Sequence, residues 1–98
     1  MINLIKRINA SSKLIYGVGT QMHLSAGGAG GVSAALSALA TTGLEVAITE
    51  LDIAGGSATD YTTVVKACLA VSSSVAITSW GVSDIVINSW RASTTPLL

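Results

Sequence analysis

The chain is poor in charge and in the residues that carry covalent or metal chemistry. Of its 98 residues a tenth are charged and half are apolar, with one Cys, one His and one Pro. A globular domain usually has about a quarter of its residues charged, so we expect most of this surface to be covered. One cysteine, Cys68, excludes a disulfide or a zinc framework within the chain. A net charge of zero with scattered Lys and Arg excludes a basic nucleic-acid footprint.

The sequence also has little that indicates a membrane or a leader. The longest charge-free run, residues 24–44, is long enough to cross a bilayer. Five Gly and five Ser or Thr in that run favour a Gly-rich loop and a buried helix instead. The amino-terminal segment, MINLIKRINASS, lacks the apolar core of a signal peptide and is typical of a short amphipathic helix. We therefore expect no membrane partner.

Hydrophobic periodicity divides the chain into alternating helices and strands. We expect a helix up to about Asn9, a strand from about Leu14, a helix closing on Gly43, a strand over 45–53, a helix capped near Thr59 or Asp60, and a strand from 74. Such alternation is typical of βαβ units and a parallel sheet. The strand cores are nearly continuously apolar, which indicates that both faces of the sheet are covered.

Polar side chains gather where these strands end. The first strand ends with Gln21 and His23, the second with Glu50 and Asp52, and the third with Trp80. Residues two apart on a strand share a face, so each polar pair lies on one face. If the two faces coincide, the carboxyl ends hold two carboxylates, an imidazole, an amide and an indole. In α/β folds this end of the sheet carries the active site.

Several functions could use such residues. GVGTQM begins like a dinucleotide fingerprint but has Met22 at its third glycine position, and GGAGG is not followed by Lys-Ser or Lys-Thr. A Ser-His-Asp hydrolase would need a Gly-x-Ser-x-Gly elbow, which is absent. A metal site of His23, Glu50 and Asp52 has no supporting ligand spacing. A purely structural role, with His23 buried and satisfied by carboxylates, stays open at this point.

Three ordered motifs resemble a known family. GVGTQMHLSAG, ITELDI and SWGVSD followed by SWRASTTPLL are similar to the last third of glycoside hydrolase family 10, the retaining endo-β-1,4-xylanases, in a fungal version. The resemblance implies an α/β fold: part of a (β/α)8 TIM barrel, with three parallel strands corresponding to barrel strands six to eight. It also implies xylan or xylo-oligosaccharide as the partner, no cofactor, and a secreted enzyme.

The resemblance assigns roles to the polar residues. Glu50 matches the catalytic nucleophile, with His23 and Asp52 as its supporting residues. Further matches are Gln21, near the sugar-binding centre, and Trp80 and Trp90, which wall the site around the cleaved sugar. A glycosidase nucleophile must be ionised and oriented toward the anomeric carbon, which is what supporting hydrogen bonds provide.

The chain also departs from the family's pattern. The family's acid/base glutamate follows an Asn on barrel strand four, and these residues contain no Asn-Glu pair. The loop from Asp84 to Trp90 is longer than the pattern, and Ser74 stands where fungal relatives often pair a second Cys with one like Cys68. We therefore expect residues 1–98 to be inactive by themselves and to self-associate through open sheet edges. A non-catalytic remnant that binds xylan weakly, and an unrelated nucleotide-binding module, remain as alternatives.

Overall fold

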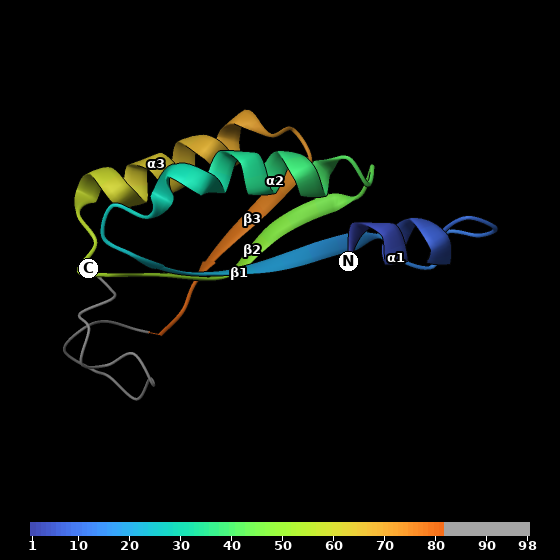
Figure 1. Ribbon diagram of the computed structural model, residues 1–98, viewed down its shortest axis with the longest axis horizontal. Helices are drawn as coiled ribbons and strands as arrows, with labels where there is room; N and C mark the ends of the chain where they lie inside the picture. The colour runs from blue at the N-terminus through green and yellow to red at the C-terminus, as the bar shows by residue number, and fades with distance from the viewer. Residues whose placement is uncertain (82–98) are drawn as a thin grey trace.

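The computed structural model describes residues 1–81. Within these residues three α-helices and three strands alternate, beginning with a helix (Figure 1). In order they are α1 (Ile2–Ile8), β1 (Gly17–Ser25), the 3₁₀ turn η1 (Ala29–Gly31), α2 (Val32–Ala40), β2 (Glu45–Ala54), α3 (Ala58–Ala70) and β3 (Ser74–Ser79). The strands form one parallel sheet in the order β1-β2-β3. This confirms the expected βαβ organisation.

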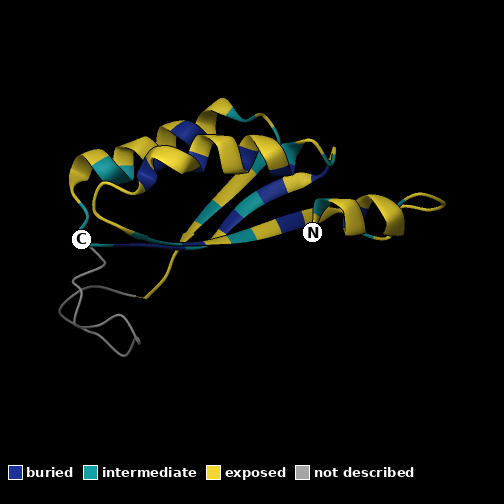
Figure 2. Cartoon of the chain, viewed as in Figure 1, coloured by how far each residue is buried: buried dark blue, intermediate teal, exposed yellow. Residues whose placement is uncertain are grey.

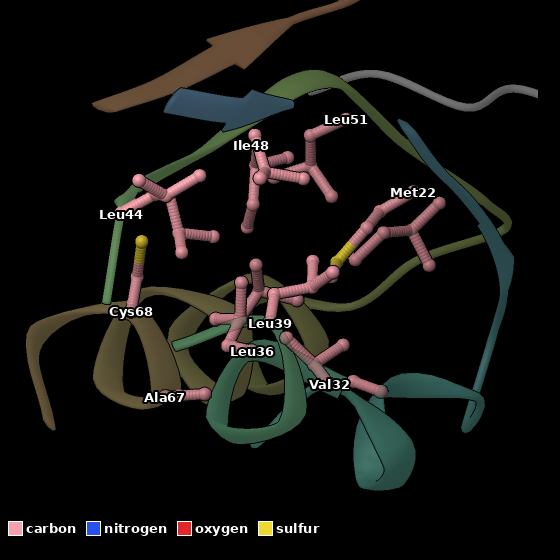
Figure 3. Packing of buried hydrophobic residues seen from close by; sticks show 14 of the residues in the cluster. Met22, Val32, Leu36, Leu39, Leu44, Ile48, Leu51, Ala67 and Cys68 are labelled. Carbon is pink, nitrogen blue, oxygen red and sulfur yellow. The ribbon is translucent and has the colours of Figure 1, made fainter. Parts of the chain in front are cut away.

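Helices α2 and α3 lie side by side over one face of the sheet, and the core lies between the two layers (Figures 1 and 2). The core residues of the sheet are Val18 and Met22 of β1 and Val46, Ile48, Leu51 and Ile53 of β2. They pack against Leu36 and Leu39 of α2 and against Val64 and Cys68 of α3 (Figure 3). Each fully buried aliphatic side chain stabilises the fold by about 1.5–3 kcal/mol relative to an exposed one.

The charge-free run of residues 24–44 is divided among the end of β1, a loop, η1 and α2. Gly43, with a φ of 74°, lies in the turn that follows α2, where a left-handed backbone favours glycine. Within residues 1–81 no helix is long and apolar enough to span a bilayer.

The first strand begins later than the sequence predicts. Asn9 follows α1, and its side chain binds the backbone of the segment that apolar residues had indicated as strand. Its Oδ1 accepts from the N–H groups of Leu14 and Ile15 at 3.0 Å, and its Nδ2 donates to the carbonyl of Ile15. These bonds hold residues 14 and 15 against the end of α1, so the strand begins at Gly17 and not near Leu14.

The amino end of α3 also differs from the expectation. The cap is Ser57, not Thr59 or Asp60, and it forms a capping box with Asp60. The Ser57 hydroxyl accepts from the Asp60 N–H at 3.2 Å, and the Asp60 carboxylate accepts from the Ser57 N–H at 3.0 Å. Two backbone donors are satisfied reciprocally, which favours this start over one further along.

One flank of α3 is apolar but uncovered. Val64, Ala67 and Cys68 are buried, whereas Val65 and Leu69 are 42% and 80% exposed. Val65 and Leu69 do not continue the buried stripe, because they turn toward an apolar hollow of about 260 Å³ beside β3. Within the described residues nothing covers this hollow on its outer side.

Strand β2 contains one residue more than its neighbours at its centre. Thr20 pairs with Ile48 and Gln21 pairs with Glu50, so the extra residue is Thr49. Between Ile48 and Leu51 the pairing with β3 shifts as well. A bulge of this kind reverses the alternation of side chains beyond it.

Candidate active site

The bulge decides which way the polar pair of β2 points. Before it, Val46 and Ile48 face the helices; after it, Leu51 and Ile53 do so. Glu50 and Asp52 therefore point to the opposite face of the sheet. The register pairs Gln21 with Glu50 and His23 with Asp52, so all four side chains lie on one face at the carboxyl ends of β1 and β2.

His23 bridges the two carboxylates. Its Nδ1 lies 2.7 Å from Asp52 Oδ2, and its Nε2 lies 3.1 Å from Glu50 Oε2. The Asp52 side chain is fully buried, while those of His23 and Glu50 are 17% and 22% exposed. Exposure of the side chains rises from Asp52 through His23 to Glu50, so Glu50 is the most accessible of these three groups.

Both oxygens of Glu50 have a partner. The amide of Gln21 donates to Oε1 at 3.0 Å, and His23 contacts Oε2. Carboxylate oxygens only accept, so a ring nitrogen of His23 that carries a hydrogen donates it to the carboxylate that it faces. Two contacts from β1 fix the plane of the Glu50 carboxylate, which is the requirement for an atom that must attack along one direction.

Trp80 completes this side of the cluster. Its backbone N–H donates to the carbonyl of Leu51 at 2.9 Å, which ties the end of β3 to β2. Its ring stands edge-on to His23, with centroids 6.3 Å apart and an interplanar angle of 87°. Trp80 is 38% exposed and offers an apolar surface beside His23. Trp90 lies outside the described residues.

The sequence analysis did not predict a hydrogen bond between the loop after β1 and the start of α3, at this end of the sheet. Asp60 Oδ1 accepts from the N–H of Gly27 at 3.2 Å, which ties the loop after β1 to the start of α3. The backbone hydrogen bond from Ser57 is the main reason that the pKa of the Asp60 carboxyl lies below its usual value; desolvation opposes it, and the hydrogen bond from Gly27 adds to the lowering. The Ser-x-x-Asp spacing was the signal that could have located the cap.

The cluster does not have the arrangement of a metal centre. Within residues 1–81, no group of three or more His, Cys, Asp or Glu side chains could hold a metal ion. Both ring nitrogens of His23 are already engaged by carboxylates. The arrangement suits an oriented, hydrogen-bonded carboxylate.

The sequence matches the family described as Glycosyl hydrolase family 10 over residues 1–98. The chain belongs to this family. It is 60% identical over 85 residues to endo-1,4-beta-xylanase 3 of Hypocrea jecorina, covering 86% of this chain and 24% of that protein. It is 44% identical over 98 residues to endo-1,4-beta-xylanase 2 of Claviceps purpurea, covering 100% of this chain and 30% of that protein. The chain thus spans about a quarter to a third of these relatives.

The fold agrees with this membership. The structure of xylanase 10C from Cellvibrio japonicus, a mutant in complex with xylopentaose, superposes with a TM-score of 0.77 at 28% identity. The match covers 100% of this chain and 26% of that one. The three parallel strands with their helices are therefore part of a (β/α)8 barrel, corresponding to its strands six to eight. The alternative of an unrelated nucleotide-binding module is wrong.

Proposed function

We propose that this chain supplies the nucleophile half of a retaining endo-1,4-β-xylanase site, with Glu50 as the nucleophile. The observation that carries the proposal is the geometry of the Glu50 carboxylate. It is held on both oxygens by Gln21 and His23 and is partly open on the face away from the helices. Membership of family 10 supports the reaction class, and the names of the relatives support xylan as the substrate.

The proposed chemistry follows from that geometry. A Glu50 oxygen attacks the anomeric carbon and forms a glycosyl–enzyme ester while the glycosidic bond breaks. The leaving oxygen takes a proton from a second carboxylic acid about 5 Å away, which the rest of a complete barrel must provide. Water then cleaves the ester, and Glu50 is regenerated. The reaction needs no cofactor.

The other residues of the cluster have supporting roles in this proposal. His23 and Asp52 hold one oxygen of Glu50 in place, as a base and its orienting partner do in other hydrolases. Gln21 holds the second oxygen and lies where a sugar hydroxyl could bind. Trp80 offers an apolar surface on which a pyranose ring can pack. The assignment of Trp90 to the same wall and the secretion of the enzyme remain predictions.

The test uses a completed barrel, in which residues 1–98 replace the matching segment of the Claviceps purpurea enzyme, which aligns with the whole chain. A 2-deoxy-2-fluoro xylobioside with a good leaving group should accumulate as an ester, because the fluorine slows its hydrolysis. Peptide mapping by mass spectrometry should locate the label on Glu50. Glu50→Gln should lower kcat by about 10⁶-fold, the scale of nucleophile loss in a serine hydrolase.

Glu45→Gln is the matched control, because Glu45 lies at the opposite end of the same strand and is exposed. It should leave both labelling and turnover unchanged. A label on any other residue, or xylan turnover retained in Glu50→Gln, would contradict the assignment.

A second candidate is a remnant that binds xylan without turnover. It is favoured by the lack of an Asn-Glu motif in residues 1–98. Binding of xylohexaose to the 98-residue chain, lost with Trp80→Ala and without release of reducing sugar, would support it.

A further inference from the structure

The residue that precedes Glu50 is held by two contacts that the catalytic cluster does not use. Thr49 is the extra residue of β2, and its hydroxyl donates to the carbonyl of Thr20 on β1 at 3.2 Å. Its γ-methyl lies over Gly19: a Cβ built at position 19 would be 2.6 Å from it. Gly19 precedes Gln21 and His23 by an even number of residues, so Thr49 lies on their face of the sheet.

Two consecutive residues, Thr49 and Glu50, therefore point to the same face, as happens at a bulge. Without the bulge, strict alternation from Val46 and Ile48 would direct Glu50 into the core. The direction of the Glu50 side chain thus depends on where the extra residue sits. Thr49 and Gly19 fix that place, because the Thr49 side chain fills the space that any side chain at position 19 would need.

We propose that Thr49 is a positioning residue. Its hydroxyl bonds to the Thr20 carbonyl and its methyl packs over Gly19, and together these contacts fix the position of the bulge that directs the Glu50 side chain to the open face. The proposal rests on the proposed function of Glu50. It assigns to Gly19 a steric role, because a β-carbon there would fall roughly 1 Å short of ordinary van der Waals contact with the Thr49 methyl. Something must then shift, and the group in the way is the Thr49 side chain, whose displacement disturbs the bulge that carries it.

The experiment is a double-mutant cycle in the completed barrel, measured as kcat and KM on a chromogenic xylobioside. Gly19→Ala should lower kcat by about 10²-fold, since a displacement of about 1 Å has that effect on a reacting group. KM should change little. Adding Thr49→Ser removes the methyl and leaves Thr49 atoms at 3.7 and 3.8 Å from the new Cβ. Gly19→Ala with Thr49→Ser should therefore recover most of the lost kcat.

Two further variants separate the contacts of Thr49. Thr49→Val keeps the methyl but loses the bond to Thr20, and should lower kcat about 10-fold, the effect of one hydrogen bond. Thr49→Ser by itself keeps the hydroxyl and should stay within about 3-fold of the parent. Gly17→Ala is the matched control, because Gly17 lies on the same strand and face with its nearest neighbouring atom at 3.5 Å. It should leave kcat unchanged.

The outcomes distinguish this proposal from the proposed function. If Glu50→Gln abolishes turnover while Gly19→Ala retains full kcat, the positioning role is wrong and the nucleophile stands. If the double variant is not rescued, the methyl contact does not set the bulge. If Thr49→Val raises KM and leaves kcat intact, Thr49 contacts substrate and does not position Glu50. If Gly19→Ala fails to fold, the Thr49 variants still decide.

Discussion

Cys68 Sγ and Ser74 Oγ lie 2.6 Å apart, where α3 ends and β3 begins. The Cys68 thiol is free and buried, and Ser74 stands where the family resemblance places a second cysteine. We expect Ser74→Cys to form a disulfide with Cys68, because the two β-substituents already face one another. Closing so short a loop should stabilise the fold by about 2 kcal/mol. The melting temperature of the oxidised variant should rise and should fall again with reductant.

Ser79→Cys is the control for this disulfide, because Ser79 is at the opposite end of β3. Thiol counting after denaturation should find no free thiol in Ser74→Cys and two in Ser79→Cys. Two free thiols in Ser74→Cys under oxidising conditions would mean that the contact is not kept in solution. In the unmodified chain, we expect a thiol reagent to label Cys68 only after denaturation.

The bridge from Asp52 through His23 to Glu50 predicts graded and non-additive effects. His23→Ala removes the contact to Glu50 Oε2 and should lower kcat by about 10²-fold in the completed barrel. Asp52→Asn should have a smaller effect, because it acts on Glu50 through the ring. The double variant should be no worse than His23→Ala by itself. Steady-state kinetics on xylo-oligosaccharides checks this, and additive losses would show that Asp52 acts independently.

Asp60 predicts a local dependence of stability on pH. Its pKa lies below the usual value of 3.8, chiefly because of the Ser57 backbone N–H, so the folded state prefers the ionised carboxylate. This stabilisation is fully present above that usual value and is lost as the pH falls through the lowered pKa. Thermal melts from pH 6 down to pH 2 should show a steeper loss for the parent than for Asp60→Asn. Equal slopes would mean that the hydrogen bonds of the Asp60 carboxylate, chiefly the one from Ser57, contribute nothing to the pH dependence of stability.

The identity of the site residues could be read from the sequence, but their common face could not. Regular alternation puts Gln21 with His23 and Glu50 with Asp52, and the structure keeps both pairs together. The same alternation would place Glu50 on the face of Ile48, which is in the core. The bulge in β2 resolves this conflict. It could not be predicted, because a threonine at position 49 does not indicate a bulge.

The predicted boundaries of helices and strands were wrong where a side chain bonds to the backbone of residues nearby in the sequence. The apolar residues around Leu14 predict a strand, but Asn9 binds their backbone first. Ser57 caps α3 two or three residues before the expected cap, although the Ser-x-x-Asp signal was present. The exposure of Val65 and Leu69 could not be predicted either, because helical periodicity marks apolar positions but does not show which neighbours are present to cover them.

The sheet edges lead to the last prediction, which concerns the 98-residue chain by itself. Among the described residues β1 and β3 each pair only with β2, so each has an open edge. Beside β3 the exposed residues Val65, Leu69 and Val75 form an apolar flank along that edge. A closed barrel has no such edges, whereas an open apolar edge pairs readily with another chain. We therefore expect the chain to self-associate when it is expressed in isolation.

Val75→Lys should weaken this association, because a charge on an edge strand opposes pairing. Sedimentation should show oligomers for the parent and a larger monomer fraction for Val75→Lys. The control is Lys66→Arg, which keeps the charge of an exposed α3 residue and should behave like the parent. Neither form should release reducing sugar from xylan. The family's acid/base motif is absent from residues 1–98. Without a second carboxyl group about 5 Å away, Glu50 cannot complete the retaining reaction. A soluble monomer that hydrolyses xylan would show that the catalytic pair or the architecture has been misassigned.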